Sequence, residues 1–123
     1  MSILLLFLGG ALGAVARFWV TRTSAALLDR SSLPYGTLAV NLLGSALLGC
    51  LLALFPPDLN SPITDQRLLL GAVGFCGALT TFSSFTTETI ALLSESKRKA
   101  LLYLVLTIAG SIGLFAFFFF LMG

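Results

Sequence analysis

The 123-residue sequence contains no histidine and few charged residues, and both absences limit its chemistry. Histidine is the commonest general base and the commonest metal ligand near neutral pH, so most catalytic arrangements are excluded. Charged residues make up only 10% of the sequence, against about 25% in an average soluble domain. The net charge is only +2 and no long basic block is present, which excludes a nucleic-acid partner. We therefore expect neither a soluble globular protein nor an enzyme.

The charged residues leave four long stretches of the chain uncharged: Met1–Ala16, Ser31–Pro57, Leu68–Thr87 and Ala100–Gly123. Each stretch can supply the roughly 20 apolar residues that cross a bilayer as a helix. The first apolar run lacks the positive start and the cleavage site of a secretory signal peptide, so we expect it to be retained. The sequence predicts one all-α integral membrane domain, residues 1–123, with four transmembrane helices in a lipid bilayer.

Polar residues and prolines between these stretches predict where the helices begin and end. The predicted helices run from about Ser2 toward Leu28, from Pro34 to Phe55, from Leu68 onward, and from Ala100 to Met122. A charged loop, Glu95–Lys99, is expected between the last two, and Thr64 and Asp65 are candidate caps before the third. Gly9 and Gly13 form a GxxxG pattern that favours close packing of the first helix.

The third apolar stretch becomes rich in hydroxyl groups at membrane depth. Six of the eight residues from Thr80 to Thr87 carry a hydroxyl, and Gly71, Gly74 and Gly77 precede them. One or two serines or threonines in a membrane helix usually bond to the carbonyl four residues earlier, but six in eight exceeds that explanation. Irregular backbone at this depth is stable only when it is buried or lines a watery cavity. We therefore expect the helix to break near Gly77–Thr80, beside a polar path.

Polar side chains on the other helices could face this segment. Thr37 and Asn41 lie four residues apart on one face of the second helix, and Thr107 and Ser111 do so on the fourth. Each pair alone could serve only to join helices. Together with the hydroxyl-rich segment, whose break would also free backbone carbonyls and a helix N-terminus, they predict the wall of a pore.

The charged and aromatic residues near this segment indicate what the pore could carry. Glu88 alone lies at the edge of a span, so no carboxylate ring is present to select cations. Arg17 and Arg22, near the end of the first helix, either serve the pore or snorkel to the interface. Phe82 and Phe85 either pack or turn the positive edge of the ring toward an anion. Neutral donors with arginines at the mouth favour an anion.

Three motifs carry a resemblance to a known family: GGALGAVARF at residues 9–18, PYGTLAVNLLG at 34–44 and GFCGALTTFSSF at 74–85. In this order and spacing, they make the chain similar to the Fluc fluoride channels, also called the CrcB family, over essentially its whole length. The resemblance implies an antiparallel, dual-topology homodimer in the bacterial inner membrane, with two fluoride pores and a central structural sodium ion. It also implies passive export of toxic cytoplasmic fluoride.

The resemblance further implies roles for individual residues. The sodium ion would be bound by the backbone carbonyls of Gly77 and Thr80 from each subunit. The pore would be lined by the family's phenylalanine pair, its asparagine and a hydroxyl track: Phe82, Phe85, Asn41, Thr37, Ser83, Ser84, Thr107 and Ser111. The vestibules would contain Arg17, Arg22 and Glu88.

The basic residues are unevenly divided between the two sides of the membrane. If the helices alternate in direction, six fall on one side, Arg17, Arg22, Arg30, Lys97, Arg98 and Lys99, and Arg67 alone falls on the other. Such a bias favours a single orientation. We expect a homodimer, and a partner subunit of opposite orientation is the alternative.

Two other functions compete with a fluoride channel. A small proton-coupled exporter of the multidrug resistance type, which can also be dual-topology, needs a titratable carboxylate in mid-membrane, and the sequence has none. A non-catalytic membrane assembly subunit would need only the glycine faces, which leaves the hydroxyl-rich segment unexplained. Cys50 and Cys76 lie in apolar stretches, where thiols usually act as small hydrophobic groups, and we assign them no role.

Overall fold

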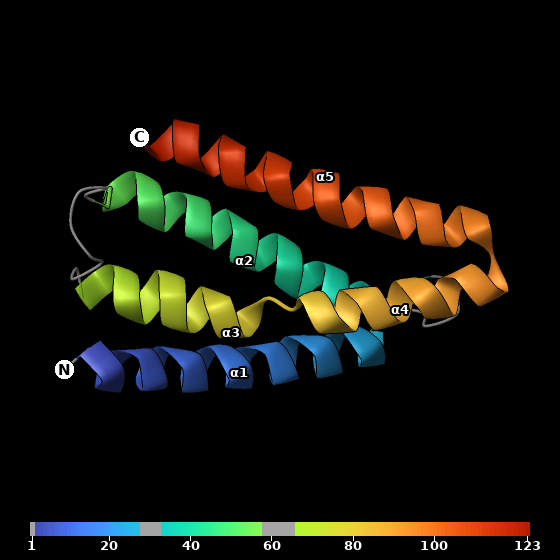
Figure 1. The fold of residues 1–123 in the computed structure, drawn as a ribbon, viewed down its shortest axis with the longest axis horizontal. Coiled ribbons are helices and arrows are strands. Elements are labelled where there is room, and N and C mark those ends of the chain that lie inside the picture. Colours follow the sequence, from blue (N-terminus) through green and yellow to red (C-terminus); the bar gives the residue numbers. More distant parts are fainter. Residues whose placement is uncertain (1, 28–32, 58–65) are drawn as a thin grey trace.

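The computed structural model describes residues 2–27, 33–57 and 66–123 (Figure 1). The elements in these residues are all helical: α1 (Ser2–Leu27), α2 (Tyr35–Leu54), η1 (Leu68–Cys76), α3 (Gly77–Leu79), α4 (Phe82–Glu95) and α5 (Lys97–Met122). Four segments are long and apolar enough to cross a membrane: Ile3–Ser24, Tyr35–Leu54, Leu68–Glu95 and Lys97–Met122. The predicted all-α architecture with four spans is confirmed for this part of the chain. The candidate caps Thr64 and Asp65 lie outside the described residues.

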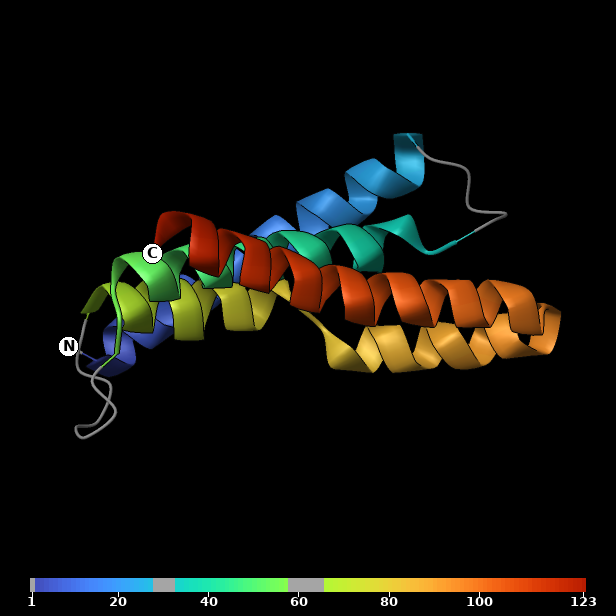
Figure 2. The same ribbon diagram turned by 90° about the horizontal axis from the view of Figure 1, so that it is seen from above.

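The spans lie side by side, and consecutive spans run in opposite directions (Figures 1 and 2). In Figure 1, α5 and α1 lie at the top and bottom edges, α2 lies next to α5, and the third span lies between α2 and α1. Both ends of the chain lie at one end of the bundle, and the α4–α5 junction lies at the other. Arg22 and Lys97–Lys99 are therefore near the end remote from the termini, whereas Arg67 is near the termini. Arg30 belongs to the residues that are not described.

Glycines allow the helices to approach each other closely. On α1, a methyl group at Gly9 would overlap the carbonyl oxygen of Leu70, and one at Gly13 would overlap that of Phe75. On α2, a methyl group at Gly49 would overlap the carbonyl oxygen of Phe115 on α5. The GxxxG face of α1 therefore packs directly against the backbone of the third span, as this motif does in other membrane proteins.

The first half of the third span is a π-helix, η1, which extends over nine residues. π-Helices, in which each backbone bond spans five residues instead of four, are rare and usually form only single-turn bulges. The guanidinium carbon of Arg67 lies 4.0 Å from the ring centroid of Phe55, which connects the start of this span to the end of α2. Nothing in the apolar pattern of residues 68–76 predicts the π-helix.

The junction between α4 and α5 is shorter than the sequence predicts. Only Ser96 separates the two helices, so the expected loop Glu95–Lys99 and the expected start at Ala100 are wrong. The Ser96 hydroxyl accepts a hydrogen bond from the Lys99 backbone N–H at 3.4 Å. A serine in this N-cap position begins a helix, which brings Lys97–Lys99 into the first turn of α5.

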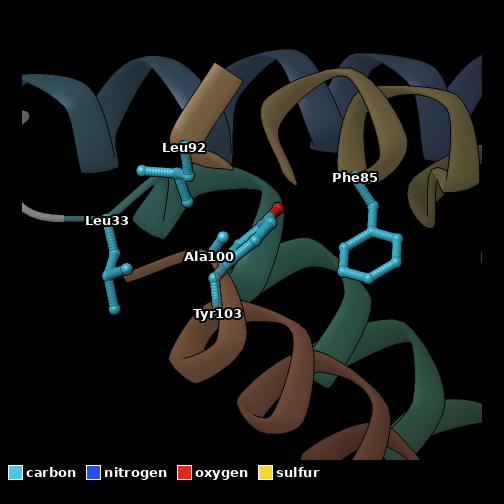
Figure 3. Packing of buried hydrophobic residues seen from close by; sticks show 5 residues of the cluster. All are labelled: Leu33, Phe85, Leu92, Ala100 and Tyr103. Atoms are coloured by element: carbon cyan, nitrogen blue, oxygen red, sulfur yellow. The ribbon is translucent and has the colours of Figure 1, made fainter. Parts of the chain in front are cut away.

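A small apolar cluster holds α4 along α5 (Figure 3). Its buried members are Leu33, Phe85, Leu92, Ala100 and Tyr103. Tyr103 is completely buried, and its ring centroid lies 5.4 Å from that of Phe85. The cluster packs the second half of the third span on α5, whereas the first half packs on α1.

Candidate ion pathway at the interrupted third span

The third span is interrupted at Thr80 and Thr81. Both residues have extended backbone, with φ/ψ of −79°/156° at Thr80 and −147°/125° at Thr81. Helix α3 ends at Leu79 and α4 begins at Phe82. The interruption therefore lies at the C-terminal edge of the expected region, and Gly77 itself is still helical.

Asn41 on α2 holds this interruption through both polar atoms of its side-chain amide. The Thr81 backbone N–H donates to Asn41 Oδ1 at 2.8 Å, and Asn41 Nδ2 donates to the Thr81 carbonyl at 3.1 Å. An amide side chain can replace a backbone partner in this way because it carries both a donor and an acceptor. Asn41 is only 8% exposed, so the pair also satisfies polar groups that are shielded from water. The second N–H of the Asn41 Nδ2 group is not used by these two hydrogen bonds.

The interruption deprives four carbonyls, those of residues 77–80, of the helical N–H donors that lie four residues later. In a continuous helix, the N–H of Thr81 would bond to the Gly77 carbonyl and that of Ser84 to the Thr80 carbonyl. Here, Thr81 donates to Asn41, and Ser84 donates to the Thr81 hydroxyl at 3.3 Å. The carbonyls of Gly77 and Thr80 are thus among the four that lack a helical donor. Carbonyl oxygens at a helix break are a common site for sodium.

A cavity of about 420 Å³ lies beside the interruption. It collects seven of the predicted site residues: Asn41, Gly77, Thr80, Phe82, Phe85, Thr107 and Ser111. Its lining also contains Ser45, Thr81 and Cys76, which the sequence analysis did not select. Ser45 could have been found from its spacing, because it follows Asn41 by four residues on the same face of α2. The lining residues in the described part of the chain include no acidic or basic group.

Thr107 offers the clearest open hydrogen-bonding group in this cavity. The residue is 5% exposed, and its hydroxyl is fully buried without a partner among the described residues. An unsatisfied buried hydroxyl costs about 1–3 kcal/mol, so a water molecule or ligand in the cavity would stabilise it. Ser111 lies one turn further along α5 and lines the same cavity.

Phe82 and Phe85 differ in their surroundings although they lie on one turn of α4. Their ring centroids are 6.0 Å apart. Phe82 is 78% exposed and lies outside the apolar cluster of the described residues, whereas Phe85 is 7% exposed and belongs to that cluster (Figure 3). Packing among the described residues therefore explains Phe85 but not Phe82.

Two predicted residues form a separate group outside the cavity. Thr37 Oγ1 donates to Glu88 Oε1 at 3.0 Å, and the Tyr103 hydroxyl donates to Glu88 Oε2 at 2.9 Å. The carboxylate therefore joins α2, α4 and α5, and the Thr37 hydroxyl is already committed to it. Sequence reasoning did not select Tyr103, although it precedes Thr107 by four residues on the same face of α5.

Three of the six hydroxyls in the hydroxyl-rich segment bond within their own helix, as serines and threonines in membrane helices usually do. Thr80, Thr86 and Thr87 each donate to the carbonyl four residues earlier, at 2.9–3.0 Å. The other three hydroxyls belong to the first turn of α4: Thr81 caps the helix, and Ser83 Oγ lies 3.4 Å from Thr81 Oγ1. Ser83 is exposed and Ser84 is half-buried.

Arg17 and Arg22 lie away from the cavity. The guanidinium carbon of Arg22 lies 5.9 Å from the ring centroids of both Phe18 and Trp19 on the same helix. The carbonyl of Arg17 accepts a hydrogen bond from the Thr21 hydroxyl. A role of either arginine in a vestibule stays a prediction.

Comparison with known proteins finds a family match over nearly the whole chain. Residues 4–120 match the family described as "CrcB-like protein, Camphor Resistance (CrcB)". The chain belongs to the CrcB family. As a CrcB protein with four spans, it is a multi-pass membrane protein and not an enzyme.

Several similar CrcB relatives share the name "Fluoride-specific ion channel FluC". The relative from Thermotoga petrophila is 40% identical over 109 residues, which cover 89% of this chain and 80% of the relative. The relative from Methanocaldococcus jannaschii is 44% identical over 111 residues, which cover 89% and 84%. A relative named FluC 1, from Nocardia farcinica, is 42% identical over 114 residues, which cover 92% and 75%.

Proposed function

We propose that this protein is a fluoride-selective ion channel that lets cytoplasmic fluoride leave the cell passively. The names of its relatives support this function. The structural observation that carries it is a cavity at membrane depth that has neutral hydrogen-bond donors and no carboxylate among its described lining residues. A carboxylate there would repel an anion, and a titratable one would be needed for proton-coupled export.

The donors in the cavity suit fluoride in particular. Fluoride is small and strongly hydrated, so a pore must replace its water with closely spaced donors. The remaining N–H of Asn41 and the hydroxyls of Thr107 and Ser111 can supply them, and Phe82 can add the positive edge of its ring. Chloride is larger and gains less from the same donors. The pathway therefore favours fluoride.

A second subunit would complete the pore. Phe82 is largely exposed, and the released carbonyls of Gly77 and Thr80 cannot face lipid without a partner. We propose an antiparallel homodimer with two pores, in which the interruptions of the two subunits meet. Because most basic residues fall on one side of the membrane, pairing with a partner subunit of opposite orientation is the alternative.

A sodium ion would fit between the two interruptions. The carbonyls of Gly77 and Thr80 from each subunit would bind it, because these oxygens have lost their helical donors. When bound, the ion would hold the two subunits together at the centre of the membrane. In this chain, the two hydrogen bonds between Asn41 and Thr81 would hold the interrupted backbone that carries these carbonyls.

Efflux from liposomes that contain the purified protein tests the proposed function. Fluoride and chloride electrodes placed side by side should record rapid fluoride efflux and little chloride efflux. Chloride efflux equal to fluoride efflux would contradict a fluoride-selective pore.

Thr80→Val should retain the central sodium ion. The proposed ligand is the Thr80 backbone carbonyl, which valine retains together with a methyl group in the same place; valine loses only the hydroxyl, which donates to the Cys76 carbonyl. A structure of the variant should therefore still show ion density between the subunits. Loss of that density in an intact dimer would show that the hydroxyl, and not the carbonyl, binds the ion.

A further inference from the structure

Gly44 packs against the interruption from the same helix as Asn41. It follows Asn41 by three residues on α2 and is buried. A methyl group at Gly44 would overlap the Cγ2 methyl of Thr80 and lie 3.6 Å from Thr80 Cβ. The missing side chain of Gly44 thus leaves a notch that the Thr80 methyl occupies.

Thr80 cannot leave this notch by a simple rotation of its side chain. Its hydroxyl donates to the Cys76 carbonyl at 2.9 Å, and its backbone N–H donates to the same carbonyl at 3.0 Å. Rotation about χ1 would break the hydroxyl bond, and β-branched side chains have few χ1 alternatives. A side chain at Gly44 would therefore displace the Thr80 backbone or separate α2 from α3.

The notch differs from the other close glycine contacts in which residue it receives. Gly9, Gly13 and Gly49 approach backbone carbonyls. Gly36 on α2 receives the Cγ2 methyl of Thr21, which lies in the continuous helix α1. Gly44 instead receives the side chain of a residue in the interruption. Next to it, Asn41 binds the backbone of Thr81, so α2 holds both residues that have extended backbone.

We propose that Gly44 is a positioning residue for ion permeation. By seating the Thr80 methyl, it fixes where the Thr80 carbonyl and the Asn41–Thr81 pair lie against the cavity. The inference rests on the proposed function of that cavity as the ion pathway. Gly44 itself supplies no donor to the ion.

A mutant cycle tests this role. Gly44→Ala should lower fluoride efflux by about tenfold or more, because the interruption is displaced from its place against the cavity. Thr80→Ser removes the methyl and keeps the hydroxyl that bonds to Cys76. In the Thr80→Ser background, Gly44→Ala should change efflux by less than about twofold relative to that background. The melting temperature of the dimer should show the same coupling, which gives a readout besides transport.

Two other glycines provide matched controls. Gly49→Ala creates a similar overlap on the same helix but against Phe115, so the Thr80→Ser background should not relieve its effect. Gly113→Ala meets nothing within 4 Å and should leave efflux unchanged.

The outcomes separate the possible explanations. An equal loss from Gly44→Ala in both backgrounds, or normal efflux from Gly44→Ala, would overturn the positioning role. If Gly44→Ala does not assemble, recovery of the dimer in the Thr80→Ser background supports the notch, and no recovery overturns it. Absence of fluoride efflux from the wild-type protein would instead overturn the proposed function, while the melting temperatures would still test the notch.

Discussion

Phe82→Ile should abolish most fluoride efflux and still yield a dimer. Phe82 is 78% exposed within the subunit, so the change removes little packing from the core described above beyond its ring contact with Phe85. Even in a core, a swap that nearly conserves volume usually costs less than about 1.5 kcal/mol. Isoleucine, however, has no positive ring edge to offer an anion. We expect efflux from liposomes to fall by about tenfold or more, while size-exclusion chromatography shows an unchanged dimer.

The chain contains a closely matched control for this substitution. Phe120 on α5 is 77% exposed and does not line the cavity, so Phe120→Ile should leave efflux unchanged. Phe85→Ile should also lower efflux, but it additionally disturbs the apolar cluster because Phe85 is buried. Wild-type efflux from a dimeric Phe82→Ile variant would show that this ring only packs against the partner.

Asn41→Asp should lower fluoride efflux steeply. The carboxylate could still accept the Thr81 N–H, but an oxygen would replace the Nδ2 donor and lie against the Thr81 carbonyl. The substitution also places negative charge in the path of an anion. The lost donor and the added charge both lower efflux, and we expect a loss of about a hundredfold in fluoride efflux from liposomes.

Ser45→Asp isolates the effect of charge alone. Ser45 lies one turn further along α2 in the same cavity and does not bond to Thr81. A greater loss of fluoride efflux in Asn41→Asp than in Ser45→Asp would measure how much the Asn41 bonds to the interruption contribute. Unchanged efflux from a dimeric Asn41→Asp variant would remove this residue from the pathway.

The features that depend on local composition were predictable from the sequence. Long uncharged stretches predict the spans, because a bilayer excludes charge wherever the chain crosses it. Pro34 and the Pro56–Pro57 pair bound the second helix at nearly the observed residues. The glycines and hydroxyls around Gly77 predict the interruption to within about two residues of its place, since weak helix formers gather there.

The features that depend on tertiary contacts were not predictable. A hydroxyl in the sequence does not reveal whether it donates to its own helix, as in Thr86, or remains open, as in Thr107. Tyr103 looks like an apolar anchor, and only the fold brings its hydroxyl to Glu88. The π-helical backbone likewise has no signal in the apolar sequence of residues 68–76, which packs against Gly9 and Gly13 of α1.

The pairing of Asn41 with Thr81 also constrains the order in which the protein assembles. While the third span lies alone in lipid, its own helix is the only partner for the Thr81 N–H, and a continuous helix leaves no backbone group unsatisfied. Once α2 packs beside it, the Asn41 amide can take over that N–H and the Thr81 carbonyl together. We therefore expect the interruption to form when the helices associate after insertion. The third span would then enter the membrane as an ordinary hydrophobic helix.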